Sequence, residues 1–359
     1  MKAAAAVGLL LASSLALAAG KTPPPPSPPP PVPMPSFSSG PALLGTNMVQ
    51  QQQQPVGAAG YPRLPPPPRT TPISIMMFYG FNETAQCGWT THGWQELGAG
   101  QAFKKNLSVA LADVVSFHAH CHAGGFVMVP PAVWALLRHG ATDWGLQLDA
   151  FEKTLAPLVS NRTVVGIFIG DEKLCGGVPL SNYTAVLAHL RAAFGRSVLL
   201  YGNECTHPRG LVVPAELDLF SFDVYDKHNV DGASEVAMVR SIAENTIFPL
   251  LAPHQKLLLV PGVYGNTPAT CEKAGGSAAV CSLDAQATQV VAKLEGFFAW
   301  ANTEGRIAGF NSWHFGHRRT PQNAAIYDME LGAVEMPTVL AKLRQIGEHI
   351  VGGGAVQTA

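Results

Sequence analysis

A short apolar run in the middle of the chain, Thr163–Glu172, limits the possible folds more than any other segment. It reads Thr-Val-Val-Gly-Ile-Phe-Ile-Gly-Asp-Glu and stops at two adjacent acids. An apolar, β-branched run of this kind is typical of a strand buried on both faces, as in a parallel sheet covered by helices. Active sites of parallel α/β proteins are built where the strands end, so Asp171 and Glu172 are catalytic candidates. The alternative is that one acid caps the following helix.

Strand-like and helix-like runs alternate through the rest of the chain, which indicates repeated β-α units. We expect strands at Ile73–Tyr79, Phe126–Val129, Val164–Ile169, Val198–Tyr201, Leu217–Asp223, Leu257–Val260 and Ile307–Trp313. We expect helices at Leu107–His120, Leu148–Leu158, Tyr183–Phe194, Val236–Asn245 and Ala285–Ala301. A further strand, second in chain order, is expected within Gly88–Gly100. The domain from about residue 73 to 351 matches the about 250 residues of a (β/α)8 TIM barrel.

The two ends of the chain have different compositions from this domain. Residues 1–19 have the basic start, Ala/Leu-rich middle and small-residue exit of a secretory signal peptide, with an uncleaved membrane anchor as the alternative. Residues 20–72 contain runs of proline and glutamine, which predict a disordered spacer rich in extended polyproline II. Such a spacer is passive, or contacts a wall or surface. Residues 352–359 are predicted to form a flexible tail, and the mature protein to be secreted, monomeric and free of membrane.

The charge balance and the cysteines narrow the class of protein further. The chain has 23 basic and 24 acidic residues, which argues against a nucleic-acid partner. Because the chain is expected to be exported, its six cysteines are predicted to form disulfides. Cys271 with Cys281 and Cys175 with Cys205 are the first pairs expected, which leaves Cys87 with Cys121. Four Asn-x-Ser/Thr sequons, at Asn82, Asn106, Asn161 and Asn182, predict a glycoprotein.

Polar and aromatic residues follow most of the expected strands, and all of them would meet at one rim of the barrel. Carboxylates and amides hydrogen-bond sugar hydroxyls, and aromatic rings stack on the apolar faces of pyranose rings. The pattern therefore predicts a carbohydrate-binding cleft. Its expected substrate contacts are Tyr79, Asn203, Glu204, Tyr225, Tyr264, Asn311, Trp313 and His314.

On these strand ends the domain resembles the glycoside hydrolase superfamily of (β/α)8 barrels. The likeness is carried by Gly170-Asp-Glu172, by Ser221-Phe-Asp-Val-Tyr-Asp226 and by Gly309-Phe-Asn-Ser-Trp313. An acid after the fourth strand is commonly the proton donor in these families, which the resemblance assigns to Glu172. Tyr225-Asp226 is similar to a pair in chitinase-like enzymes, and Asp171-Glu172 to the acid pair of hexosaminidases. The strand-seven glutamate of many retaining enzymes is absent, because Pro261-Gly-Val-Tyr264 stands there.

The predicted chemistry is hydrolysis of an O-glycosidic bond in a polysaccharide or glycoconjugate. It needs an acid to protonate the leaving oxygen and, in most families, a second carboxylate as nucleophile or base. We expect Glu172 to be the general acid, with a pKa raised by desolvation. Asp223 or Asp226 is the expected partner, followed by Glu204, whereas Asp171 orients Glu172 or a substrate amide. The reaction requires no cofactor and no metal.

The sequence is also compatible with two other functions. His118-Ala-His-Cys-His122 resembles a metal-binding strand end of amidohydrolases, although Leu107–His122 is read better as a helix ended by Gly124-Gly125. A metal-dependent amidohydrolase-like enzyme is therefore a lesser alternative. The missing strand-seven acid favours a second alternative, a non-catalytic secreted protein that binds glycans or associates with a cell wall.

Overall fold

The computed structural model describes residues 73–79, 86–95, 107–138, 140–205, 211–224, 232–273, 276–313, 315 and 330–353. The predicted signal peptide and proline-rich spacer, residues 1–72, lie outside these residues, as does the part of the expected tail after residue 353. Within the described part, no helix combines the length and the apolar character needed to cross a bilayer.

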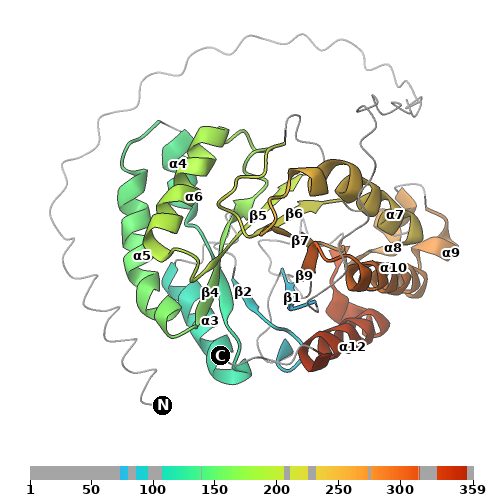
Figure 1. The fold of residues 1–359 in the computed structure, drawn as a ribbon. Coiled ribbons are helices and arrows are strands. Elements are labelled where there is room, and N and C mark those ends of the chain that lie inside the picture. The colour runs from blue at the N-terminus through green and yellow to red at the C-terminus, as the bar shows by residue number, and fades with distance from the viewer. Residues whose placement is uncertain are drawn as a thin grey trace, which may run out of the picture. The chain divides into compact units, whose positions relative to one another are not determined.

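An eight-stranded parallel sheet forms the centre of the domain (Figure 1). The strands are, in sheet order, β1 (Ile75–Phe78), β9 (Ile307–Ser312), β7 (Lys256–Leu259), β6 (Leu219–Asp223), β5 (Leu199–Cys205), β4 (Val164–Asp171), β3 (Gly125–Met128) and β2 (Gly93–Gln95). The ends of this order, β1 and β2, meet through Thr91, whose backbone N–H donates to Met76 O at 2.9 Å. The Thr91 hydroxyl also accepts from Met76 N–H at 2.7 Å. The sheet therefore curls into a barrel, which confirms the predicted fold class and the second strand.

Helices cover the outside of the sheet, as Figure 1 shows for both sides of the barrel. They are α3 (Leu107–Cys121), α4 (Pro131–Arg138), α5 (Trp144–Ser160), α6 (Leu180–Phe194), α7 (Gly232–Ile242), α8 (Pro268–Lys273), α9 (Ala278–Cys281), α10 (Leu283–Thr303) and α12 (Pro337–Gly353). A π-helical turn, Ala243–Ile247, extends α7, and a small antiparallel pair joins β8 (Gly265–Asn266) to β10 (Glu330–Leu331). All five predicted helices are present. Helices α4 and α12 were not predicted, although each begins with a proline, a residue favoured at the first helical position.

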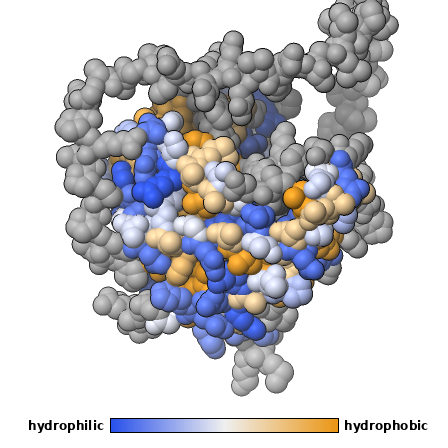
Figure 2. Space-filling model, turned by 90° about the vertical axis from the view of Figure 1, so that its right-hand side faces the viewer, coloured by the Kyte–Doolittle hydropathy of each residue, from blue (hydrophilic) through white to orange (hydrophobic). Residues whose placement is uncertain are grey.

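Alternation along the strands divides the apolar residues between two cores. On β1, Ile75 and Met77 face the barrel interior, whereas Met76 and Phe78 face the helices. The interior cluster consists of Ile75, Met77, Tyr79, Phe126, Met128, Phe168, Tyr201, Leu219, Leu258 and Val260. In the described part of the chain few large apolar residues are exposed, and on the face drawn in Figure 2 hydrophobic residues are scattered among hydrophilic ones.

An irregularity in β4 decides which way its terminal acid points. The pairing register with β5 shifts between Phe168 and Gly170, and Asp171 then pairs with Asn203. Strict alternation would place Asp171 on the helix side with Ile169, but the bulge turns it to the interior side. Gly170 has φ +141°, a backbone conformation that other residues rarely adopt. The bulge therefore delivers a carboxylate to the barrel mouth.

All three predicted disulfides are present. Cys87 bonds to Cys121, Cys175 to Cys205 and Cys271 to Cys281. The second bridge ties the loop after β4 to the end of β5. Such bridges are compatible with an extracellular protein.

Candidate active site

One amide joins two carboxylates at the carboxyl end of the barrel. The side-chain nitrogen of Asn203 donates to Asp171 Oδ1 at 2.7 Å and to Asp223 Oδ2 at 2.9 Å. Carboxylate oxygens only accept, so the amide must present its nitrogen to them. Asp171, Asn203 and Asp223 come from β4, β5 and β6, which are neighbours in the sheet. The structure thus brings together three residues that the sequence predicted for the site.

A directional chain of hydrogen bonds supports this amide from within the barrel. Ser221 Oγ donates to Asn203 Oδ1. Its oxygen must then accept from the Tyr201 hydroxyl, at 2.7 Å, and Tyr201 in turn accepts from Asn311 Nδ2 at 3.1 Å. Burial raises the pKa of Tyr201, which keeps its phenol protonated and able to donate. Every donor in the chain points toward the two carboxylates, so each bond polarises the next in favour of negative charge there.

Glu172 lies one residue beyond this network, where β4 becomes a loop. Its φ is +47°, uncommon for a residue other than glycine, and its N–H donates to Asn203 O at 2.9 Å. Glu172 is solvent-exposed. Partial desolvation of its carboxyl group, followed by the negative charge of Asp171, nevertheless raises its pKa. The pKa of Asp171 is raised as well, because burial outweighs the bond from Asn203. Two adjacent acids with raised pKa values are typical of a site for proton transfer.

Glu204 points away from the interior, on the opposite face of β5 from Asn203. It is buried, with 1% of its surface exposed, and does not face solvent. Its two oxygens accept from the backbone N–H groups of Leu174 and Cys175, at 3.1 and 3.2 Å. Desolvation raises the pKa of Glu204 to about 7, opposed by those two bonds. Glu204 therefore holds the loop that carries Glu172, a position different from the one expected for a sugar contact.

Aromatic rings lie at the same end of the barrel as the acids. Tyr79 and Trp313 meet edge to face with ring centroids 5.3 Å apart, and Tyr79 meets Phe168 at 6.2 Å. Trp313 is half-buried and is bridged to Gly262 after β7. Tyr264 is buried just beyond that bridge. The expected contacts Tyr79, Asn311 and Trp313 thus belong to the strand ends around the acids.

Three predicted site residues, Tyr225, Asp226 and His314, lie outside the described residues. Two others were missed as members of the site. Tyr201 and Ser221 carry the hydrogen-bond chain, and each is separated by two residues along its strand from a predicted site residue. Polar side chains at alternate positions of otherwise apolar strands were the available signal.

The histidine cluster lies at the other end of the barrel. His118 and His120 belong to α3, before β3 begins, and bind carbonyl oxygens of Ala123 and Ser116. His122 leaves the helix with φ +55°. His118 and His122 line a cavity of about 1300 Å³ together with residues that precede β4 and β5. These histidines are therefore remote from the strand ends where an amidohydrolase-like metal would be held.

The comparisons with known proteins return structures but no sequence family. No protein-family model matches the chain, and no curated protein matches its sequence. A chitinase from Rhizomucor miehei has 13% identity and a TM-score of 0.45, covering 77% of this chain and 99% of its own. A GH113 beta-mannanase from Alicyclobacillus acidocaldarius has 13% identity and a TM-score of 0.45, covering 77% and 97%. A xylanase A catalytic core has 13% identity and a TM-score of 0.47, covering 77% and 98%. Likenesses this distant assign no activity to the chain.

Proposed function

We propose that this chain is a secreted glycoside hydrolase acting on a polysaccharide or glycoconjugate. The observation that carries the proposal is the Asn203 amide that donates to both Asp171 and Asp223. Hydrolysis of a glycosidic bond needs one carboxyl group as acid and, in most families, a second as base or nucleophile, and this bridge holds Asp223 beside the Asp171-Glu172 segment. The half-buried ring of Trp313, which packs on Tyr79 at the same end of the barrel, suits a sugar ring.

In this proposal Glu172 is the general acid. Its raised pKa favours the protonated form that the leaving oxygen requires. Asp223, whose Oδ2 accepts from the Asn203 amide, is the base or nucleophile. Asp171 lies next to Glu172 in the chain, and its charge raises the pKa of Glu172. We assign Asp171 to positioning rather than to attack.

A non-catalytic glycan-binding or wall-associated protein is the second candidate. The segment after β7 favours it, because Pro261-Gly-Val-Tyr264 offers no carboxylate and is buried. The proline-rich segment before the barrel would then contact the wall or surface. Both candidates share the aromatic strand ends and differ in whether a bond is cleaved.

The test is reducing-sugar release by the full secreted chain from a panel that includes chitin, mannan, xylan and β-1,3-glucan. The wild-type protein is compared with Asp223→Asn, which keeps the shape and removes the charge. We expect release from at least one polysaccharide and a fall in kcat of about 100-fold or more in the variant. Asp284→Asn, at an exposed position on α10, is the matched control and should retain activity.

Two results would count against the proposal. Equal activity in wild type and Asp223→Asn would remove Asp223 from the reaction. Binding of a panel glycan by the wild type, without release of reducing ends from any of them, would favour the second candidate.

A further inference from the structure

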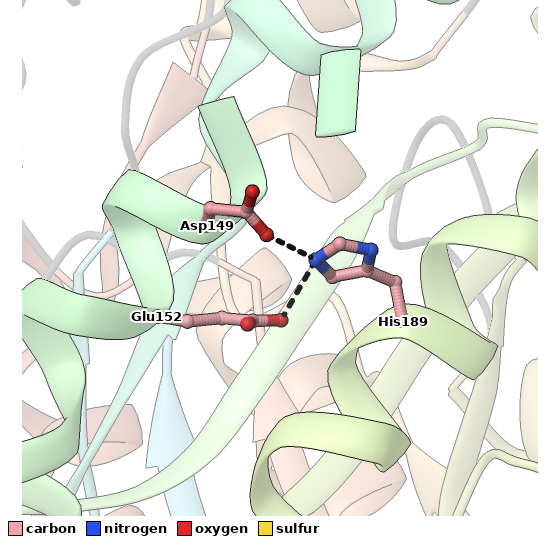
Figure 3. A group of neighbouring side chains, drawn as sticks. All are labelled: Asp149, Glu152 and His189. Carbon is pink, nitrogen blue, oxygen red and sulfur yellow. Dashed lines mark hydrogen bonds and ion pairs between the residues drawn. The ribbon is translucent and has the colours of Figure 1, made fainter. Parts of the chain in front are cut away.

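A group of metal-binding side-chain types lies between α5 and α6, on the outside of the barrel (Figure 3). Asp149 and Glu152 are three residues apart on α5 and so share a face of that helix. His189 comes from α6. Its Nε2 atom lies 3.1 Å from Asp149 Oδ1 and 3.3 Å from Glu152 Oε1, and Figure 3 shows both contacts converging on this one nitrogen.

These separations are those of neighbouring ligands around a small divalent ion. Zinc binds histidine nitrogen and carboxylate oxygen at about 2.0–2.2 Å, so adjacent ligand atoms of a tetrahedral or octahedral zinc site lie roughly 3.0–3.5 Å apart. Both distances from His189 Nε2 already fall in this range. All three ligand atoms lie within 4.8 Å of one another. An ion therefore fits after a small approach of the two carboxylates.

The contacts within the group leave one buried oxygen without a hydrogen bond. His189 Nε2 is hydrogen-bonded to Asp149. Glu152 Oε1 is a buried atom that accepts no hydrogen bond of regular geometry among the described residues, although it lies at ion-pair distance from the ring. One ring N–H cannot serve two acceptors equally.

The two helices hold the group in place while leaving it open to ions. Helix α5 buries Leu148, Phe151 and Leu155, and the Trp144 ring meets the His189 ring edge to face at 5.9 Å. The Asp149 side chain is 62% exposed, whereas that of Glu152 is 16% exposed. The ligands are therefore fixed on the inner side and accessible from the solvent on the outer side.

We propose that Asp149, Glu152 and His189 form a binding site for one divalent transition-metal ion, with Zn²⁺ as the best fit and water completing the coordination. An imidazole with two carboxylates suits zinc and its neighbours, whereas Ca²⁺ and Mg²⁺ prefer oxygen ligands alone. The ion clamps α5 to α6. This site is separate from the acids at the barrel mouth and takes no part in hydrolysis.

The test is a Zn²⁺ titration of the full secreted chain after treatment with a chelator, followed by calorimetry. Wild type is compared with His189→Ala and with Glu152→Gln, which keeps the side-chain shape. His118→Ala is the matched control, because His118 lies with His122 on a separate cavity lining. Thermal unfolding with and without Zn²⁺ is measured on every protein.

We expect one ion per wild-type and His118→Ala chain, with a rise in the melting temperature on adding Zn²⁺. Each site variant should bind Zn²⁺ about 100-fold more weakly or worse, since loss of a direct ligand exceeds the 10–100-fold cost typical of changes around the ligands. The variants should fold and lose only the Zn²⁺-dependent rise. The proposal would be overturned if the wild type bound no Zn²⁺, or if His189→Ala bound it as tightly as the wild type. The three side chains would then form an ion pair and no metal site.

Discussion

At the scale of single residues, Asn203 is the centre of the site. It holds two carboxylates with its nitrogen and receives a chain of donors through its oxygen. Sequence patterns predicted Asp171, Asn203 and Asp223 as site residues because each ends a buried strand. They did not predict that a single amide would connect them. That connection depends on the bulge at Gly170, which reverses the alternation on which a sequence prediction relies.

Removing the Asn203 amide should change the pH dependence of activity. The bond from Asn203 acts to lower the pKa of Asp171, and the same amide nitrogen donates to Asp223. In Asn203→Ala the acid limb of the kcat/KM profile should therefore move to higher pH, and kcat should fall by about 10-fold or more. The measurement is a pH series of initial rates. Asn245→Ala, exposed after α7, is the control, and a fall in rate with an unshifted limb would contradict this role.

At the level of elements, two features hold the loop after β4. The Glu204 carboxyl group accepts from two of its backbone N–H groups, and the Cys175–Cys205 disulfide ties it to β5. Because the pKa of Glu204 is raised from 4.5 to about 7, its contribution favours folding at acid pH and is lost as pH rises through about 7. A Glu204→Gln variant lacks this dependence. Between pH 4.5 and pH 7.5 the unfolding free energy of the wild type should therefore fall relative to that of Glu204→Gln, by ~3 kcal/mol at most.

Urea unfolding across that pH range measures the difference for Glu204. Glu348→Gln, on the exposed side of α12, provides a reference in which no such trend is expected. If the difference in unfolding free energy between wild type and Glu204→Gln stays constant with pH, folding does not change the pKa of the Glu204 carboxyl group.

The disulfides allow a matched comparison of loop and scaffold. Cys175–Cys205 closes 30 residues and Cys271–Cys281 closes 10. Replacing either pair with serine should lower the unfolding free energy by about 3 kcal/mol. Only loss of the first pair frees the loop that carries Glu172, so its effect on kcat should be much larger. Equal losses of kcat in the two double variants would refute a role of the loop in the reaction.

At the scale of the whole molecule, the barrel closes where the first two strands meet. The Thr91 hydroxyl accepts from Met76 N–H. In Thr91→Val that buried donor loses its partner, and the free energy of unfolding should fall by about 1–3 kcal/mol. Thr154→Val removes a hydroxyl that donates to Ala150 O on an exposed turn of α5, and the free energy of unfolding should fall by less. Chemical denaturation of both variants measures these losses. Equal losses would show that the hydrogen bond between Thr91 and Met76 does not stabilise closure of the barrel.

The fold was more predictable than the site. Buried β-branched runs such as Val164–Ile169 mark parallel strands directly, so the barrel followed from local patterns. The position of Glu204 did not, because alternation tells which face a residue takes and not what lies opposite that face. Asp149, Glu152 and His189 were missed for a related reason: their proximity arises only when α5 packs beside α6. Contacts between distant segments remain outside local sequence patterns.

In the proposed hydrolysis, Glu172 gives its proton to the glycosidic oxygen. The pH–rate profile of the full chain beside Glu172→Gln, on any polysaccharide that the wild type degrades, tests this role. We predict that kcat falls by about 10²–10⁴-fold and that the basic limb of the profile disappears, because glutamine has no transferable proton. A Glu172→Gln protein with wild-type kcat and an unchanged basic limb would contradict the claim.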